Sequence, residues 1–170
     1  MYVMKFGGTS VTKPESVAAI VKLVKLGLAN QPVIVVSALS GVTDLLVKLS
    51  HSSDGDIREQ IFTELAFKHD SWIDNILADN DLAQIKAHQI VDDYFCELIE
   101  LLKSQIITSQ LELHDSVVAF GEKISSALIS FYLRLHDIGA EQLLATKCII
   151  TTSQFGGADF IDAPTKKASK

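Results

Sequence analysis

Apolar positions follow two kinds of pattern in the first 36 residues. Residues 2–4 form a short strand-like run, and aliphatic residues then recur at helical spacing from Pro14 to Leu28. The Asn30–Pro32 stretch breaks this helix, and Val33–Val36 is a continuous β-branched run, as in strands buried on both faces. We therefore predict a β-α-β unit, with two parallel strands and a right-handed crossover.

The rest of the chain is mainly helical in pattern. Apolar stripes predict helices on either side of a break at residues 79–81. A third helix should start after Asp115, as its N-terminal cap, and end at Gly139, and its apolar circumference indicates deep burial. Residues 140–152 predict one or two further strands, and a glycine turn follows at residues 155–158. These elements predict an α/β fold with a mainly parallel sheet.

Composition narrows the class of protein. The 170 residues are 48% hydrophobic and 21% charged, which suits one globular core, and no repeat or linker divides the chain. No apolar run approaches the ~20 residues that span a bilayer, and no signal peptide is visible, so we expect a cytoplasmic protein without a membrane partner. A net charge of −6 argues against nucleic acid. Cys96 and Cys148 are expected to be buried thiols, and the histidines lack ligand-like partners.

Two glycines follow the first strand. Met4–Ser10 runs from apolar residues into Gly7, Gly8 and two hydroxyls, with Lys5 at the lip. Glycines allow positive φ and close approach of backbone N–H groups to a ligand, and a helix N-terminus adds further donors. The stretch therefore predicts an anion-binding turn for phosphate. An ordinary tight turn with a solvent-facing lysine is the alternative.

A second polar loop follows the second strand. Ser37–Asp44 gathers hydroxyls and small residues at a helix start, where Ser40, Thr43 and Asp44 could bind a ligand or serve as ordinary caps. Because the carboxyl ends of parallel strands meet at one edge, both loops should face the same crevice, where open α/β sheets bind ligands. A third feature is Gly121–Glu122 inside the apolar helix, readable as a packing glycine beside an exposed glutamate or as a site for a cationic group such as an ammonium.

Three of these stretches resemble one family. Lys5–Val11, Val36–Asp44 and Phe120–Ser125 resemble, in order and spacing, the N-terminal half of aspartokinases in the amino-acid kinase superfamily, and the resemblance covers essentially the whole chain. It implies an incomplete three-layer αβα, carbamate kinase-like fold. Residues 1–170 would then be the N-terminal portion of the catalytic domain, without the nucleotide-binding half or regulatory domains.

The resemblance also implies an activity. Aspartokinases transfer the γ-phosphate of Mg-ATP to the β-carboxylate of L-aspartate, giving 4-phospho-L-aspartate for lysine, threonine and methionine synthesis. The resemblance implies that Lys5 is catalytic, that Mg²⁺ is bound mainly through ATP with no metal-ligating residue in this chain, and that the parent protein is a homo-oligomer. The implied phosphate-binding residues are Lys5, Phe6, Gly7, Gly8, Thr9 and Ser10, and the implied aspartate-binding residues are Ser37, Ala38, Thr43 and Glu122.

The chain departs from the family pattern in places. Lys123 stands where arginine is usual, Ser153 stands where aspartate is common, and the Arg-Gly-Gly-Ser-Asp stretch is absent. We therefore expect little activity from these residues alone. Two other functions stay open: a non-catalytic binding or assembly module of the same fold, and a kinase for another carboxylate or carbamate. No Gly-x-x-x-x-Gly-Lys-Ser/Thr loop supports an unrelated nucleotide fold.

Overall fold

The first 36 residues contain the predicted β-α-β unit. The computed structural model describes residues 2–104, 106–107 and 109–169. Its two strands are parallel and pair in register from Val3 opposite Val33 to Phe6 opposite Val36. The unit consists of β1 (Val3–Phe6), α1 (Gly8–Thr12), α2 (Pro14–Gly27), the 3-10 helix η1 (Leu28–Asn30) and β2 (Val33–Val36).

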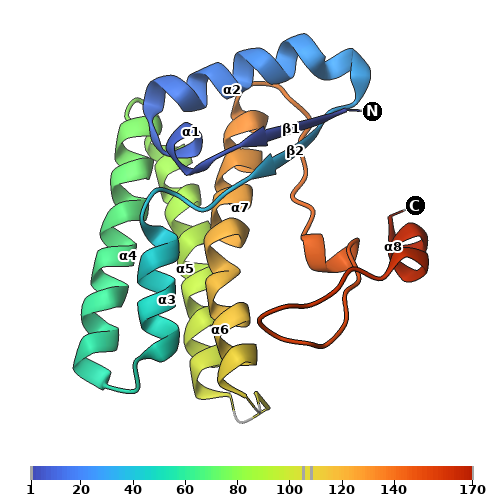
Figure 1. Cartoon of the computed structure of the whole chain (residues 1–170). Coiled ribbons are helices and arrows are strands. Elements are labelled where there is room, and N and C mark those ends of the chain that lie inside the picture. Colours follow the sequence, from blue (N-terminus) through green and yellow to red (C-terminus); the bar gives the residue numbers. More distant parts are fainter. Residues whose placement is uncertain (1, 105, 108, 170) are drawn as a thin grey trace.

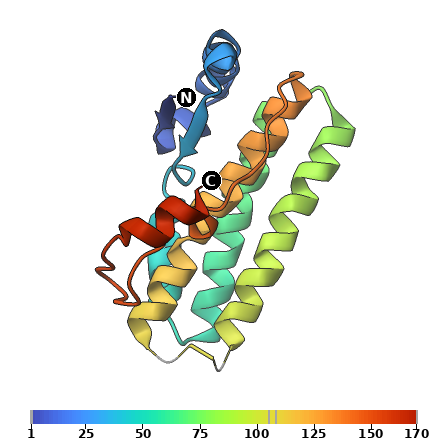
Figure 2. The same ribbon diagram turned by 90° about the vertical axis from the view of Figure 1, so that its right-hand side faces the viewer.

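A helical bundle makes up most of the remainder. Figures 1 and 2 show the strands and α2 lying across one end of the bundle. Within it, α3 lies against α4 and α6, and α5 lies against α7. The bundle helices are α3 (Val42–His51), α4 (Gly55–Ile76), α5 (Asp81–Lys103), α6 (Gln110–Val118) and α7 (Phe120–Leu135).

Helix α7 is the centre of the core. Ten of its 16 residues are buried, among them Ile124, Leu128 and Leu133, so the expectation of a helix buried on most of its circumference is confirmed. Together α6 and α7 (Gln110–Leu135) are long and apolar enough to cross a membrane by length and composition alone. Because 61% of the most apolar window is buried inside the protein, this stretch is accounted for as a core helix.

The helix ends follow local side-chain chemistry. Asp54 caps α4 by accepting the Ile57 N–H at 3.0 Å, and Asn80 caps α5 by accepting the Ala83 N–H at 3.0 Å. The expected cap at Asp115 is wrong, since Ser109 accepts the Glu112 N–H at 3.1 Å and α6 already runs through Asp115.

Two further expectations about this region are corrected. Helix α7 ends at Leu135, four residues before Gly139, and Asp137 takes the left-handed backbone (φ 62°). The chain can therefore leave the helix without waiting for a glycine, because aspartate tolerates this conformation better than most residues. The thiol of Cys96 is exposed rather than buried, because it lies on the outer side of α5.

The sheet is buried on one face only. Met4, Phe6, Ile34 and Val36 pack against the core, whereas Val33 and Val35 are 41% and 43% exposed. The expectation of two-sided burial for Val33–Val36 is therefore wrong for the described residues. The side chains of a strand alternate between faces, and here only the bundle side of the two strands is covered.

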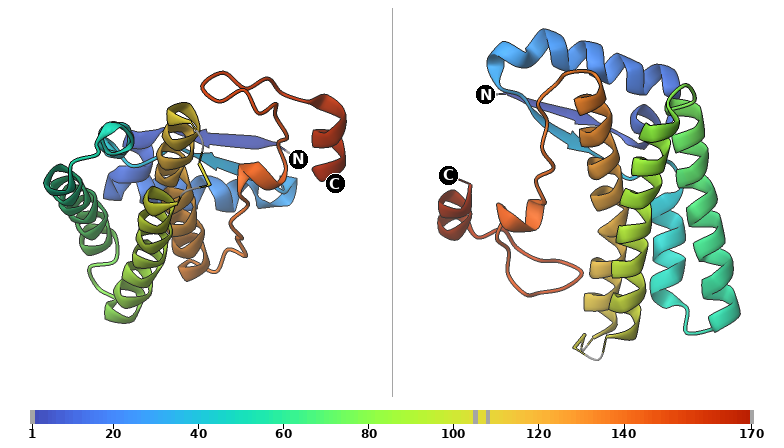
Figure 3. Two further views of the ribbon diagram at one scale, coloured as in Figure 1. Left: turned by 90° about the horizontal axis from the view of Figure 1, so that it is seen from below. Right: turned by 180° about the vertical axis from the view of Figure 1, so that it is seen from behind.

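The chain after α7 runs outside the bundle. Figure 3 shows it leaving the end of α7, descending alongside the bundle and ending in α8 (Asp162–Ala168). The strands expected in residues 140–152 do not form: residues 145–147 are a 3-10 helix, η2 (Ala145–Lys147), and only one bridge joins Thr151 to Phe160. A strand needs a neighbour for its N–H and C=O groups, and this segment does not join β1 or β2.

Candidate functional site

The two predicted loops leave the same edge of the sheet. Ser37 N–H donates to Phe6 O at 3.1 Å, which extends the strand pairing by one residue beyond β1 and β2. We call residues 6–10 the first loop and residues 37–41 the second loop. Their adjacency, expected from parallel strands, is confirmed.

Close packing explains one glycine of the first loop. Gly7 is extended (φ −78°, ψ 172°), so the positive φ expected there is absent. A Cβ on Gly8 would lie 3.0 Å from the Ala38 carbonyl oxygen, so Gly8 allows the two loops to touch. Helix α1 has only five residues, so it contributes free N–H groups at its first turn but little macrodipole.

The second loop turns tightly into α3. Gly41 has φ 77°, a left-handed conformation that favours glycine, and Val42 N–H closes the turn on Leu39 O at 3.0 Å. Ala38 and Leu39 are buried, whereas Thr43 in the first turn of α3 is exposed. The second loop is thus anchored by its apolar side chains, while the Thr43 hydroxyl of α3 stays accessible to a ligand.

Gly121 and Glu122 bring the third motif to the same place. A Cβ on Gly121 would lie 2.7 Å from the Ala38 Cβ, so the packing-glycine interpretation is correct. Ala38 N–H donates to Glu122 Oε1 at 3.2 Å, which ties α7 to the second loop across 84 residues of sequence. All three motifs therefore converge on Ala38.

Lys5 and Lys123 differ in their surroundings. Lys5 pairs with Val35 in the sheet and is exposed on the side away from the core, one residue before the first loop. Lys123 lies over the Phe120 ring, with Nζ 4.2 Å from the centroid, a cation–π contact within α7. Lys5 is thus the accessible cation beside the glycines.

Other predicted features lie apart from the loops. Gly156 N–H, in the turn near Ser153, donates to Asp115 Oδ2 at 2.7 Å, so that turn docks on α6 toward the other end of the bundle (Figure 1). A hollow of about 330 Å³ opens between α5, α7 and Gln142 and is lined by Asp93, Glu97 and Arg134. Neither loop lines this hollow.

Sequence reasoning missed three residues that support the loops. Thr12 hydrogen-bonds both loops, Lys68 Nζ donates to Ser40 O at 3.2 Å, and Trp72 Nε1 donates to Val11 O at 2.7 Å. The partners lie 28 to 61 residues away, so no local pattern signals these contacts. The one available signal was that Trp72 is the only tryptophan of the chain.

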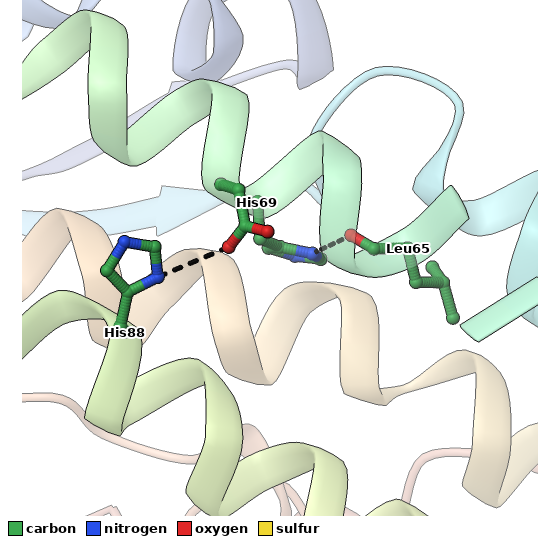
Figure 4. Close-up of polar contacts among 4 residues, drawn as sticks. Leu65, His69 and His88 are labelled. Carbon is green, nitrogen blue, oxygen red and sulfur yellow. Dashed lines mark hydrogen bonds and ion pairs between the residues drawn. The ribbon is translucent and has the colours of Figure 1, made fainter. Parts of the chain in front are cut away.

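A buried histidine neighbours these α4 residues. His69 Nδ1 lies 2.7 Å from Leu65 O, and Asp70 on the next position pairs with His88 of α5 at 3.2 Å (Figure 4). Burial is the main cause that lowers the pKa of His69, outweighing the Leu65 carbonyl and Asp70, which favour the protonated ring. We infer that His69 is neutral, with Nδ1–H donating to Leu65 O.

The comparisons with known proteins assign the family. Residues 1–167 match the model of the amino acid kinase family, so the chain belongs to this family. Among its relatives, the aspartokinase of Chlamydia muridarum is 30% identical over 155 residues, covering 90% of this chain and 32% of the relative. Aspartokinase 3, chloroplastic, of Arabidopsis thaliana is 30% identical over 173 residues, covering 99% and 30%. The resemblance to aspartokinases is confirmed.

A solved structure confirms the fold. E. coli aspartokinase III in complex with aspartate and ADP superposes with a TM-score of 0.82 at 24% identity, covering 99% of this chain and 36% of that one. At this identity the likeness establishes the amino-acid kinase fold. The chain spans about a third of the length of these relatives.

Proposed function

We propose that the chain is the N-terminal, aspartate-binding portion of an aspartate kinase catalytic domain. The observation that carries the proposal is the convergence of the three motifs on Ala38, which Gly8, Gly121 and Glu122 all contact or closely approach. These motifs are far apart in sequence but resemble one family's site, and the relatives above carry the name aspartokinase.

The first loop would hold the transferring phosphate. The β-carboxylate oxygen of aspartate attacks the γ-phosphorus, the bond to the bridging oxygen breaks, and ADP leaves with that electron pair. Lys5, an exposed cation at the end of β1, would stabilise the charge on the transferring group. Backbone N–H groups of Gly7 and Gly8 and the hydroxyls of Thr9 and Ser10 would bind the phosphates beside it.

The second loop and Glu122 would hold aspartate. Ser37, Ala38 and Thr43 line the start of α3, and Glu122 would receive the substrate ammonium. Ala38 N–H occupies one lone pair of Glu122 Oε1 and so fixes the orientation of the carboxylate. The second oxygen keeps its acceptor capacity for an ammonium donor. Holding both reactants in this way supplies much of the acceleration in phosphoryl transfer.

ATP and Mg²⁺ fit this arrangement as a pair. Across residues 2–104, 106–107 and 109–169, no group of three or more His, Cys, Asp or Glu side chains could hold a metal ion. In the proposed reaction, the triphosphate of ATP would supply the principal Mg²⁺ ligands. The metal would neutralise phosphate charge while the loop donors orient the γ-phosphate.

The proposal extends to the whole protein. Because the chain covers about a third of its relatives, we assign the nucleotide-base pocket and any regulatory domains to sequence beyond the matched region. The complete protein would be a cytoplasmic homo-oligomer that catalyses the first step toward lysine, threonine and methionine. Residues 1–170 alone would have little activity.

Acyl-phosphate formation tests the proposal. We would assay the full-length protein and the 170-residue chain with Mg-ATP and L-aspartate, trapping the product as the hydroxamate, with L-glutamate and carbamate as comparison substrates. The full-length protein should turn over aspartate at about 1–10³ s⁻¹, as enzymes do, and the chain alone far more slowly. Preference for another substrate would contradict the aspartate assignment. No phosphoryl transfer by the full-length protein would contradict the kinase assignment and favour a binding module.

A further inference from the structure

Thr12 joins the two loops through a single hydroxyl group. It is the last residue of α1, two residues after the end of the first loop. Its Oγ1 donates to Gly8 O at 2.6 Å and accepts the Ser40 N–H at 2.9 Å. Since a hydroxyl has one proton and Ser40 N–H can only donate, both bond directions are fixed. The hydroxyl therefore links the backbone of the first loop to that of the second.

Helix α4 binds the carbonyl group of Ser40, whose N–H group is bound by Thr12. Lys68 donates to Ser40 O at 3.2 Å, so the N–H and the C=O of Ser40 are both bound, from α1 and from α4. One turn further along α4, the buried Trp72 indole N–H donates to Val11 O at 2.7 Å. Helix α4 thus supports the second loop at Ser40 and helix α1 at Val11, one residue after the first loop, while Thr12 connects the two loops directly.

A second threonine shows what is special about Thr12. Thr63 Oγ1 donates to Glu59 O at 3.0 Å, the same bond to the fourth preceding carbonyl within a helix. Among the described residues, the Thr63 hydroxyl makes this local bond alone. The Thr12 hydroxyl makes the local bond and also accepts the N–H of Ser40, 28 residues away. Thr63 is therefore a matched control for the local bond.

We propose that Thr12 is a positioning residue that sets the distance and orientation of the aspartate-side loop relative to the phosphate-side loop. This inference rests on the proposed function. It adds a residue that touches neither reactant but controls how they face each other. Small displacements between reacting groups cost far more in rate than in binding. Removing the hydroxyl should therefore lower kcat more than it raises either KM.

The test compares Thr12→Val with Thr12→Ser and Thr63→Val in the full-length protein. Valine keeps the shape of threonine without the hydroxyl, and serine keeps the hydroxyl. We expect Thr12→Val to lower kcat by about 10- to 100-fold, with each KM changed less than about threefold. Thr12→Ser should restore most of the rate, and Thr63→Val should match the parent. Equal kcat in Thr12→Val and the parent, or no rescue by serine, would overturn the inference.

Amide exchange gives a readout that does not need catalysis. Loss of the Thr12 acceptor should speed exchange of the Ser40 amide by about tenfold, the effect of one lost hydrogen bond. The indole N–H resonance of Trp72, the only tryptophan of residues 1–170, should keep its position and so report an intact fold. Unchanged Ser40 exchange would overturn the inference. If the parent enzyme proves inactive but Thr12→Val still speeds Ser40 exchange, the linkage between the loops is supported and only the proposed function is contradicted.

Discussion

Two glycine pairs lie near opposite ends of the chain and differ in what holds them. Gly7–Gly8 belongs to the strand–loop region, residues 2–44, where Gly8 packs against the Ala38 carbonyl. Gly156–Gly157 belongs to the C-terminal region, residues 139–169, where Gly156 has φ 80° and binds the Asp115 carboxylate through its N–H. The first pair permits contact between loops, and the second permits a turn.

Each of the two regions also contains a run of β-branched residues, and only one of these runs forms a strand. Val33–Val36 pairs with β1 and places alternate side chains on the core. Residues 147–152 are also rich in β-branched side chains, yet Thr151 alone makes a bridge, and Thr165 is the buried side chain of the described C-terminal region. Residues of high β-propensity therefore formed a strand only where a neighbouring strand could pair with them and one face was covered.

The largest expected effect is a loss of kcat on replacing Lys5 of the strand–loop region, compared with Lys166 of the C-terminal region. Lys5→Ala in the full-length protein should lower kcat by about 10²–10³, because the transferring phosphoryl group loses its stabilising charge. Lys166→Ala in α8, which removes a surface pair with Asp162, should leave kcat unchanged. Hydroxamate kinetics measure both. Equal losses of aspartate affinity and rate in Lys5→Ala would contradict the assigned role.

A substitution at Glu122 tests the aspartate side of the site. Glu122→Gln keeps an oxygen that can accept the Ala38 N–H but removes the charge for an ammonium. We expect KM for aspartate to rise about 10- to 100-fold, the range for hydrogen bonds to charged groups, with KM for ATP little changed. The exposed Glu141 provides the control substitution, Glu141→Gln. A selective rise in KM for ATP would place Glu122 on the wrong substrate.

Alanine at one glycine of each pair tests the packing difference. Gly8→Ala should lower the free energy of unfolding by about 1–3 kcal/mol, because its Cβ meets the Ala38 backbone oxygen. Gly157→Ala has open space around the added Cβ and should change stability by less than about 0.5 kcal/mol. Urea denaturation of both variants gives the answer. Equal effects would mean that the two glycine pairs do not differ as described.

The smallest effect concerns pH and the helix that buttresses the loops. Burial lowers the pKa of His69 below 6.5, so the unfolded chain binds more protons than the folded one in the range between the two pKa values. Stability should therefore be full above pH 6.5 and fall as the pH drops below it.

Urea denaturation at pH 7.5 and 5.5 measures this dependence. His69→Leu should lose less stability on acidification than the parent, because it removes the buried imidazole whose pKa is lowered. Fluorescence of Trp72, one turn from His69 on α4, would follow the same transition. A steeper loss in His69→Leu would contradict the sign of the pKa shift.

Much of the fold was predictable because its signals are local. The β-α-β unit, the break at residues 79–81 and the apolar α7 all follow from spacing and caps within a few residues. The one or two strands expected in residues 140–152 and the two-sided burial of Val33–Val36 failed, because they depend on which distant segments pair with a strand or cover it. Asp115 failed as a cap because α6 already begins at Gln110, and its carboxylate binds Gly156 N–H, 41 residues away, instead.

The residues of the candidate site also divide into those with a local sequence signal and those defined by distant contacts. Lys5, the glycines and Glu122 could be found as motifs, because each lies in a contiguous stretch. Thr12, Lys68 and Trp72 could not, since their importance comes from partners in other elements. Sequence thus indicated the groups that we propose to touch the substrates, and the structure adds those that hold the loops together.

Chemical-shift mapping with L-aspartate tests the convergence on Ala38 most directly. Millimolar L-aspartate would be added to the ¹⁵N-labelled full-length protein with ADP present, and D-aspartate would serve as the control. The account predicts L-specific shifts at the amides of Ala38, Thr43 and Glu122, and none at residues 151–160. Shifts confined to residues 151–160, or none at Ala38, would contradict it.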